Sequence, residues 1–300
     1  MCRHSNSISG PLRWRSSVLV TFSKRDSFVK AMFSVIVAIV LGCRVAAADT
    51  VLVNYPDFSS TSGLNLQGAT SKVGNVLRVS GTSGANGDAG SAWNMTQQPV
   101  ASGFSTTFRF QITQLTGIND DDGNNGGDGF AFGIQNSSGT ALGATGGGMG
   151  YGGITNSVAV EFDTFRNALI GDPNGNHISV HTGGTAANSD LEDHSLGIAT
   201  NLPNMSDGNI HTAGILYVPG TMTVSLDGAD VLTVPLNLST KLNLNSGNAW
   251  MGFTAGFSGA SENHDILNWS VNALPEPSSL VLVGAGVLSL ISCKFRRPNA

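Results

Sequence analysis

The chain has 300 residues, of which 39 are glycine, with 12% charged and 40% hydrophobic residues. A glycine-rich, weakly charged chain favours an all-β protein with many turns over a helical one. The net charge of −5 offers no basic surface, which argues against nucleic acid as a partner. The three cysteines, Cys2, Cys43 and Cys293, lie in the terminal segments, so the centre of the chain is expected to fold without disulfides.

Residues 1–48 have the pattern of a signal peptide. Basic residues precede the apolar stretch Ala31–Gly42, and the small residues Ala46–Ala48 follow it just before Asp49. This order predicts export with cleavage before Asp49. A membrane anchor is the alternative, but the stretch is shorter than the ~20 residues that a spanning helix needs. Val40–Cys43 also resembles, more weakly, a lipoprotein cleavage site.

Residues 49–273 contain repeated short strand patterns separated by Gly, Asn and Ser. Between Phe104 and Ile112 apolar and polar residues alternate, as they do in a strand with one buried face. Thr221–Leu226 and Val231–Val234 flank Asp227-Gly228, which predicts a β-hairpin. We find no helix, internal repeat or second domain in this region. It is therefore predicted to be one all-β domain, a sandwich of antiparallel sheets.

Two loops share only their composition with known ligand loops. Asp120–Asp128 has Asn125 and Ala131 where an EF-hand requires Gly and Glu, so we expect a solvated loop. Gly146–Gly153 lacks the Lys-Ser/Thr pair and the helix that follow a phosphate-binding loop. Neither loop predicts a site by itself.

The strand that begins at Val158 and the loop after it carry the most informative residues. The apolar residues of this strand point to one face, so Glu161 and Asp163 point to the other. Asp172 and His177 follow in the loop. Carboxylates grouped in this way repel one another unless a cation lies between them. Oxygen ligands suit Ca²⁺ and a site with imidazole suits Mn²⁺ or another transition metal, so two ions could share Asp163 and Asp172. The alternative is an exposed polar strand edge that runs into a turn.

The C-terminus carries a second addressing pattern. Pro275-Glu276-Pro277 is followed by the apolar stretch Leu280–Ile291 and by the basic residues of Lys294–Arg297. This arrangement resembles the bacterial PEP-CTERM sorting signal. The resemblance implies that residues 274–300 hold a transmembrane segment, engage the membrane and a sorting protease transiently, and are removed. A permanent single-span anchor is the alternative. In both cases the protein is expected to be secreted or held in the cell envelope or extracellular matrix.

Seven segments between about Asp49 and Asn272 carry a family resemblance, namely Asn54–Phe58, Leu64–Gly68, Phe104–Phe110, Gly127–Phe132, Val158–His177, Met251–Gly256 and Glu262–Ser270. Taken in this order, they resemble the legume (L-type) lectins. The resemblance implies a concanavalin A-like jelly-roll sandwich of antiparallel sheets. It also implies a metal site in which Glu161 and His177 bind Mn²⁺, Asp163 and Asp172 bridge both ions, and Asn167 and the backbone carbonyl of Phe165 bind Ca²⁺. No hydroxyl residue can be assigned to the Mn²⁺ surroundings, and His181 is expected to lie on the sheet surface.

The same resemblance implies a sugar site beside the calcium ion. Its residues would be Asp128 as acceptor, the Asn167 amide and the Gly147 N–H as donors, the Phe165 ring as an apolar face, and Gly259 and Ala260 in a short specificity loop. The Gly127–Asp128 peptide corresponds to one that is cis in the family. Family members usually have Ala where Gly127 stands, which is a mild departure.

The implied function is non-catalytic glycan binding, in adhesion at the cell surface or within an exopolysaccharide matrix, with a homodimer left open. An enzyme is the first alternative, because the same sandwich hosts retaining glycoside hydrolases. Those need two carboxylates about 5–5.5 Å apart, and Phe165 and Arg166 stand where the second one should be. The other alternative is a structural matrix protein that has lost sugar binding.

Overall fold

The computed structural model describes residues 50–81, 87–120, 122–123 and 125–274. The predicted signal peptide before Asp49 and the predicted sorting signal after Leu274 lie outside the described residues. Within the part that is described, no helix is long and apolar enough to cross a membrane.

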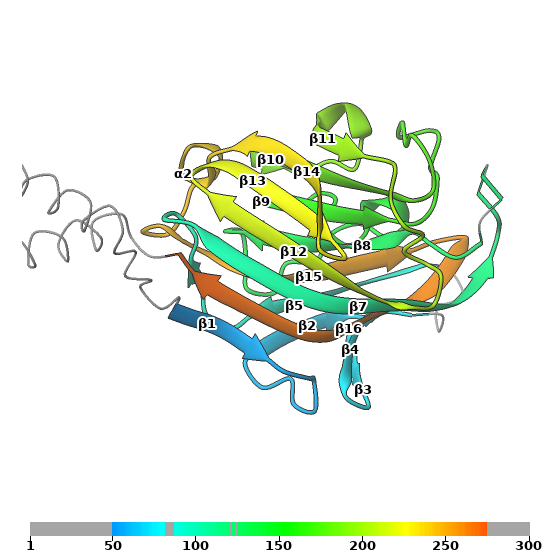
Figure 1. Cartoon of the computed structure of the whole chain (residues 1–300), viewed down its shortest axis with the longest axis horizontal. Coiled ribbons are helices and arrows are strands. Elements are labelled where there is room, and N and C mark those ends of the chain that lie inside the picture. The colour runs from blue at the N-terminus through cyan, green and yellow to red at the C-terminus, as the bar shows by residue number, and fades with distance from the viewer. Residues whose placement is uncertain (1–49, 82–86, 121, 124, 275–300) are drawn as a thin grey trace, which may run out of the picture. The chain divides into compact units, whose positions relative to one another are not determined.

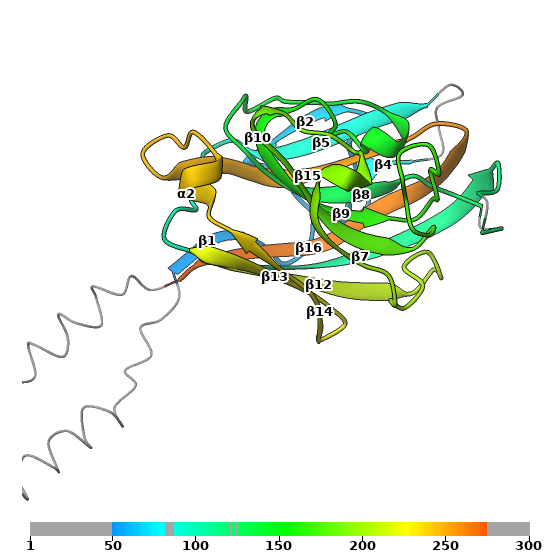
Figure 2. The ribbon, with the colours of Figure 1, turned by 90° about the horizontal axis from the view of Figure 1, so that it is seen from above.

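The domain is built from two antiparallel sheets that lie face to face (Figures 1 and 2). The first, here called the β7 sheet, has the spatial order β14 (Ala229–Leu236), β13 (Gly220–Leu226), β12 (Ile210–Val218), β7 (Phe104–Gly117), β16 (Ala260–Ala273), β4 (Val76–Ser80) and β3 (Ser71–Val73), with β1 (Thr50–Tyr55) also paired to β16. The second, the β9 sheet, has the order β11 (Ser195–Ala199), β10 (His177–Ala187), β9 (Thr155–Asp163), β8 (Gly129–Gln135), β15 (Asn248–Phe257), β5 (Asp88–Asn94) and β2 (Leu64–Gly68), with β6 (Gln98–Pro99) paired to β15. The predicted antiparallel sandwich is confirmed.

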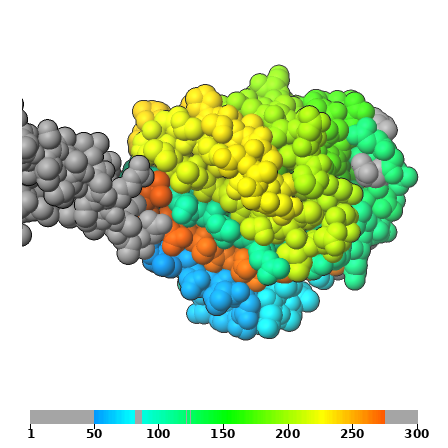
Figure 3. Space-filling view, viewed as in Figure 1, coloured from blue at the N-terminus to red at the C-terminus, as the bar shows by residue number. Residues whose placement is uncertain are grey.

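Neighbouring strands in each sheet come from distant parts of the sequence. In the β7 sheet, β7 lies between β12, which comes about a hundred residues later in the chain, and β16, which comes still later; β1 lies on the other side of β16 (Figure 3). The N-terminal strand β1 pairs with the C-terminal strand β16, with Thr50 opposite Ala273. The fold therefore depends on long-range pairing rather than on local hairpins alone.

The core lies between the two sheets and is rich in phenylalanine. Alternate residues of β7 from Phe104 to Ile112 are buried, as the sequence pattern predicts. The ring of Phe108 in the β7 sheet lies 5.0 Å from Phe253 and 5.7 Å from Phe162 in the β9 sheet, measured between ring centroids. Burying such side chains stabilises the fold by about 1.5–3 kcal/mol each, which joins the sheets.

The predicted hairpin is present as β13 and β14. Asp227 and Gly228 connect the two strands with φ of 50° and 84°. Positive φ at both turn residues suits Asp-Gly, and it matches the twist of the flanking strands. The region predicted to lack helices contains one four-residue helix, α2 (Leu238–Lys241), which begins where Asn237 accepts a hydrogen bond from the Ser239 N–H. Such a short helix leaves no periodic pattern in the sequence.

Three strand ends of the β9 sheet meet at one edge. In the ladder Asp163 at the end of β9 pairs with His177 at the start of β10 and with Gly129 at the start of β8. Asp128 immediately precedes β8, and the two-residue turn between β15 and β16, Ser258–Gly259, follows the strand paired with β8. The topology therefore brings segments from four parts of the chain to one place.

A glycine-rich segment covers the face of the β9 sheet that points away from the core. This segment contains one 3-10 turn, η1 (Gly146–Gly148). Met149 and Tyr151 of this segment form a small buried cluster with Ala131 and Ala159 of the sheet. Polar residues on this face of β9 and β10 are consequently enclosed rather than solvated.

Candidate metal and carbohydrate site

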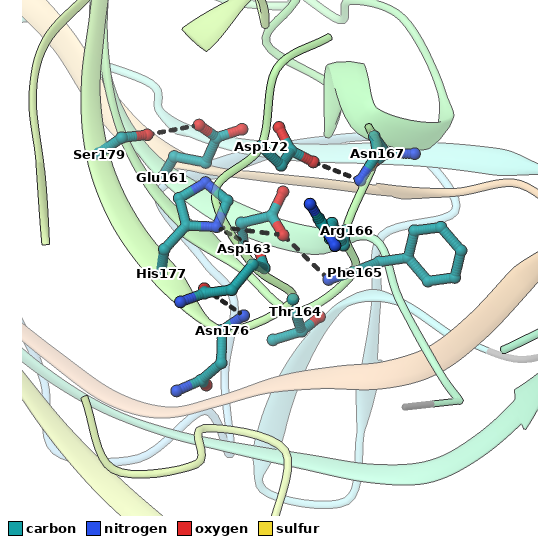
Figure 4. Close-up of polar contacts among 12 residues, drawn as sticks. Glu161, Asp163, Thr164, Phe165, Arg166, Asn167, Asp172, Asn176, His177 and Ser179 are labelled. Carbon is teal, nitrogen blue, oxygen red and sulfur yellow. Dashed lines mark hydrogen bonds and ion pairs between the residues drawn. The ribbon is translucent and has the colours of Figure 1, made fainter. Parts of the chain in front are cut away.

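Four side chains predicted as metal ligands lie together at the end of β9. Glu161, Asp163, Asp172 and His177 are all buried, and Asp163, Asp172 and His177 each offer a ligand atom within 4.8 Å of the others. Figure 4 shows the three carboxylates and the His177 ring facing one another, whereas the Phe165 ring points away. The apolar residues of β9 point into the core, as the alternation predicts.

The loop after β9 wraps around its own carboxylates. Asp163 Oδ1 accepts a hydrogen bond of 2.9 Å from the Phe165 N–H, and Asp172 Oδ2 accepts one of 2.5 Å from the Asn167 N–H. The remaining oxygens Asp163 Oδ2 and Asn167 Oδ1 are buried and have no hydrogen-bond partner. Buried polar atoms are almost always partnered, so two such oxygens indicate room for a bound cation.

The electrostatics of the cluster also fit a cation. Burial raises the pKa of Asp163 well above its ordinary value, and the neighbouring Glu161 and Asp172 raise it further. Burial also raises the pKa of Asp172, to about 7, against the opposing hydrogen bond from the Asn167 backbone. Carboxylates held in this way resist ionisation unless positive charge is added. Carboxylate and amide oxygens suit Ca²⁺, and the imidazole suits a transition metal.

His181 is not on the sheet surface, and that expectation is wrong. It is fully buried, and its Nε2 lies 2.9 Å from Glu161 Oε2 and 3.5 Å from Glu192 Oε1. The covering segment that contains Tyr151 buries this face, and the Tyr151 hydroxyl donates a 3.2 Å hydrogen bond to Glu161. Ser179 also donates to Glu161, at 2.7 Å, which places a hydroxyl in the site where none could be assigned from the sequence.

Glu192 is a further member that no sequence pattern predicts. It lies in the 3-10 turn η2 (Glu192–His194), and its Oε1 is 3.0 Å from His177 Nε2. Burial raises the pKa of Glu192, but hydrogen bonds from His177 and His181 outweigh burial and lower it to about 2. Burial lowers the pKa of His181, but its hydrogen bonds to Glu161 and Glu192 raise it to about 10. The end of β9 thus holds four carboxylates and two imidazoles.

Asp128 is fixed by its backbone and has an unpartnered carboxylate oxygen. The Gly127–Asp128 peptide is cis, the Asp128 N–H donates to Gly256 O at 3.2 Å, and Asp128 O accepts from the Thr164 N–H at 3.0 Å. Its Oδ2 is buried without a hydrogen-bond partner. Burial raises the pKa of Asp128 to about 6, against the opposing effect of the Asn167 side chain.

Local packing explains why position 127 holds glycine. Its φ is +147°, and a Cβ built there would lie 2.7 Å from Phe165 Cβ. Glycine therefore lets the loop that carries Phe165 approach the strand entry at Asp128 closely. A side chain at this position would push that loop outward.

A pocket of about 450 Å³ opens beside these residues. Three of its lining residues were predicted for the sugar site, namely Gly147, Phe165 and Asn167, and Leu169 also lines it. Asp128 lies next to this pocket. Gly146 stands between the lining residues Thr145 and Gly147, and a Cβ built on Gly146 would be 4.0 Å from Asp128 Oδ2. Of the predicted loop pair, Gly259 is exposed in the turn, whereas Ala260 is buried in β16 opposite Gly117.

The acidic loop before Asp128 is solvated only in part, because Asp122, Gly123 and Asn125 are exposed but the loop is also fastened to the segment that follows β9. Asp120 is buried and its Oδ2 accepts a 3.1 Å hydrogen bond from the Arg166 N–H. Asp122 Oδ1 lies 3.3 Å from Arg166 Nη1, and Asp122 Oδ2 accepts from the Gly175 N–H at 2.9 Å. These carboxylates brace the loop that connects β9 to β10.

Comparisons with known proteins agree with this architecture. Agglutinin-2 of Cladrastis kentukea is 31% identical over 199 residues, covering 60% of this chain and 61% of agglutinin-2. The probable L-type lectin-domain containing receptor kinase S.7 of Arabidopsis thaliana is 32% identical over 184 residues, 56% of this chain but 25% of the kinase. The chain therefore spans less than two thirds of the length of either relative.

Solved structures give the same result. A lectin from Bauhinia forficata, determined in complex with GalNAc, superposes with a TM-score of 0.60 at 26% identity, covering 75% of this chain and 99% of that lectin. A seed lectin from Lotus tetragonolobus, at 24% identity, shares the fold with a TM-score of 0.60 over 75% of this chain and 99% of its own. The profile of the legume lectin domain family matches residues 51–280. The chain therefore belongs to the legume lectin domain family.

Proposed function

We propose that this domain is an exported lectin that binds glycans through a site organised by one Ca²⁺ ion and one transition-metal ion. The observation that carries the proposal is the pair of unpartnered oxygens, Asp128 Oδ2 and Asn167 Oδ1, buried beside an open pocket. Membership of a family of non-enzymatic carbohydrate-binding domains supports glycans as the ligand.

The Ca²⁺ ion would be held by the side chains of Asp163, Asn167 and Asp172 and by the carbonyl of Phe165. The transition-metal ion would be held by Glu161 and His177 together with Asp163 and Asp172. Bound cations would keep these carboxylates ionised and hold the loop after β9 in one conformation.

Sugar recognition would use residues from four segments. Asp128 accepts hydrogen bonds from sugar hydroxyls, whereas the Asn167 amide and the Gly147 N–H donate to them. Phe165 gives an apolar surface for the pyranose ring, Gly259 belongs to the short turn at the rim, and Ala260 is the first residue of β16 after that turn. A hydroxyl-rich ligand needs several fixed polar partners and one flat apolar face, and these residues can supply both.

A hydrolase is not favoured by the site. Phe165 and Arg166 stand where a second catalytic carboxylate would be required. Metal-held carboxylates are also poor proton carriers, because the cations keep them ionised. A structural protein without sugar binding remains the alternative that experiment must separate.

We further propose that residues 1–48 direct export and that residues 274–300 act as a removable sorting signal. The protein would then work at the cell surface or in an exopolysaccharide matrix. Mass spectrometry of the protein exported by its native host is expected to find a C-terminus near Pro275. Recovery of the intact chain through Ala300 in the membrane fraction would instead identify a permanent anchor.

A glycan array tests the central proposal. The wild type is applied both with Ca²⁺ and Mn²⁺ and after chelation. The variants Asp128→Asn and Asp230→Asn are applied with both ions, and Asp230→Asn is the control, because Asp230 is exposed and distant in the sequence. Binding is expected for the wild type and for Asp230→Asn, and it should be lost after chelation and in Asp128→Asn. A wild type that binds no glycan with both ions present would support the structural alternative.

A further inference from the structure

One buried carboxylate is used by neither the predicted metal ligands nor the proposed sugar site. Glu192 is 7% exposed, and its Oε1 lies 3.0 Å from His177 Nε2. Glu161, His177 and Glu192 each offer a ligand atom, and these atoms lie within 4.8 Å of one another. The second oxygen, Glu192 Oε2, is buried without a hydrogen-bond partner. A buried carboxylate with a free oxygen beside other ligand atoms calls for a cation.

The backbone holds Glu192 in this place. The Glu192 N–H donates to Ile170 O at 3.0 Å, and the Ile170 N–H donates to Asn167 O at 3.0 Å. The turn that carries Glu192 is therefore tied to the loop that carries Asn167 and Asp172. These bonds keep the backbone of Glu192 beside the residues proposed to hold the metals.

The His177 ring is oriented as a metal ligand is. Its Nδ1 lies 2.9 Å from the carbonyl oxygen of Asn174, which can only accept, so Nδ1 carries a hydrogen, and Nε2, which points to Glu192, is the nitrogen that could bind a metal after losing its own proton. Metal-bound histidines usually donate their other ring N–H to a carbonyl or carboxylate in this manner.

We propose that Glu192 is an additional ligand of the transition-metal ion, on the same side as Glu161 and His177. This inference rests on the proposed function, because it assumes that a transition metal binds at all. With Glu192 the cluster has four carboxylates, which balance the charge of two divalent cations. An added anionic ligand takes a coordination position that water would otherwise occupy. The site should therefore bind its transition metal more tightly than a site in which water fills that position.

His181 defines the competing explanation. Its Nε2 lies near both Glu161 and Glu192, so Glu192 could serve only as an ion-pair partner of the two histidines. Under that explanation, loss of the Glu192 charge would alter folding stability and leave metal coordination unchanged. Direct measurement of the metal separates the two roles.

The experiment uses the purified full chain, stripped of metal, saturated with Ca²⁺ and titrated with Mn²⁺ while free Mn²⁺ is followed by electron paramagnetic resonance. Glu192→Gln is expected to weaken Mn²⁺ binding at least tenfold and to retain one equivalent of Ca²⁺. Asp193→Asn is the matched control, because the neighbouring Asp193 side chain is 81% exposed, and it should bind Mn²⁺ like the wild type. Substitution with Co²⁺ should give a visible spectrum that changes in Glu192→Gln and not in Asp193→Asn.

Each outcome decides one question. A wild type that takes up Ca²⁺ but no Mn²⁺ or Co²⁺ contradicts the proposed transition-metal site, and the role of Glu192 falls with it. If the wild type binds Mn²⁺ and Glu192→Gln binds it with the same affinity and gives the same Co²⁺ spectrum, the role of Glu192 is overturned and the transition-metal site stands. If Glu192→Gln does not fold, Glu192→Asp keeps the charge for both histidines but withdraws the carboxylate by one methylene. Weaker Mn²⁺ binding then supports coordination, and unchanged binding overturns it.

Discussion

At the scale of single residues, Asp128 is expected to make the proposed sugar binding depend on pH. Burial raises its pKa to about 6 in the metal-free protein. The ionised carboxylate accepts hydrogen bonds from sugar hydroxyls, whereas a protonated carboxyl is a poorer acceptor. A bound cation lowers this pKa, so sugar affinity is expected to be constant near pH 8 and to fall only at or below about pH 6.

Isothermal titration calorimetry between pH 5 and pH 8, with both metals in excess, measures this dependence. Metal content must be recorded at each pH, because the pKa of Asp172 is also raised, to about 7. A loss of affinity that begins above pH 7 while both ions stay bound would contradict the assignment to Asp128.

His211 provides a pH dependence of stability away from the metal loop. Its Nδ1 lies 2.8 Å from Asp227 Oδ2 and its Nε2 lies 3.2 Å from Asp207 Oδ1. Burial lowers the pKa of His211, but the two carboxylates outweigh burial and raise it. Because the folded pKa exceeds the unfolded one, this contribution is complete below about pH 6.5 and is lost as pH rises through the folded value. Urea unfolding should show His211→Gln to be more destabilising at pH 5.5 than at pH 9, and an equal difference at both would contradict the ion-pair role.

At the scale of elements, the loop between β9 and β10 is expected to depend on the metals for its order. Its N–H groups at Phe165 and Asn167 donate to Asp163 and Asp172, which are both proposed ligands. Without cations these carboxylates repel, so the loop should open more often. Hydrogen exchange measured by mass spectrometry should be faster in residues 164–176 after chelation and unchanged in β7. Equal exchange with and without metals would show that the loop is ordered by the protein alone.

Elements with a strong local signal could be predicted from the sequence. Alternation revealed β7 and β9, and Asp227-Gly228 revealed the β13–β14 hairpin. The side chains of residues 161–177 that meet at the end of β9 could also be chosen, because one strand and its loop carry them. A period of two tells which residues share a face.

The remaining site residues depend on tertiary packing. Alternation does not tell whether a face is covered, and Tyr151 of the covering segment is what buries His181. Glu192 comes fifteen residues after His177, and its turn is held beside His177 by a hydrogen bond to Ile170. Sequence spacing carries no information about such a contact.

At the scale of the whole domain, the aromatic core holds the two sheets together. Phe108 contacts Phe162 and Phe253 across the interface between them. Phe108→Ala should therefore lower the free energy of unfolding by about 3–5 kcal/mol, since a buried Phe is replaced by a cavity. Arg109→Ala, on the exposed side of the same strand, should change it by less than about 1 kcal/mol. Equal effects of both variants in urea unfolding would contradict this account of the core.

The pairing of β1 with β16 has a consequence for how the protein can be displayed. Thr50 and Ala273 are opposite each other, so the chain enters and leaves the sandwich at one end. The other end of β16, at Ala260, adjoins the turn beside the proposed sugar pocket. Fourteen residues of strand separate the two ends, a standoff of about 40 Å. A tether attached at either end of the sandwich domain would therefore leave the pocket about one strand length away from the point of attachment.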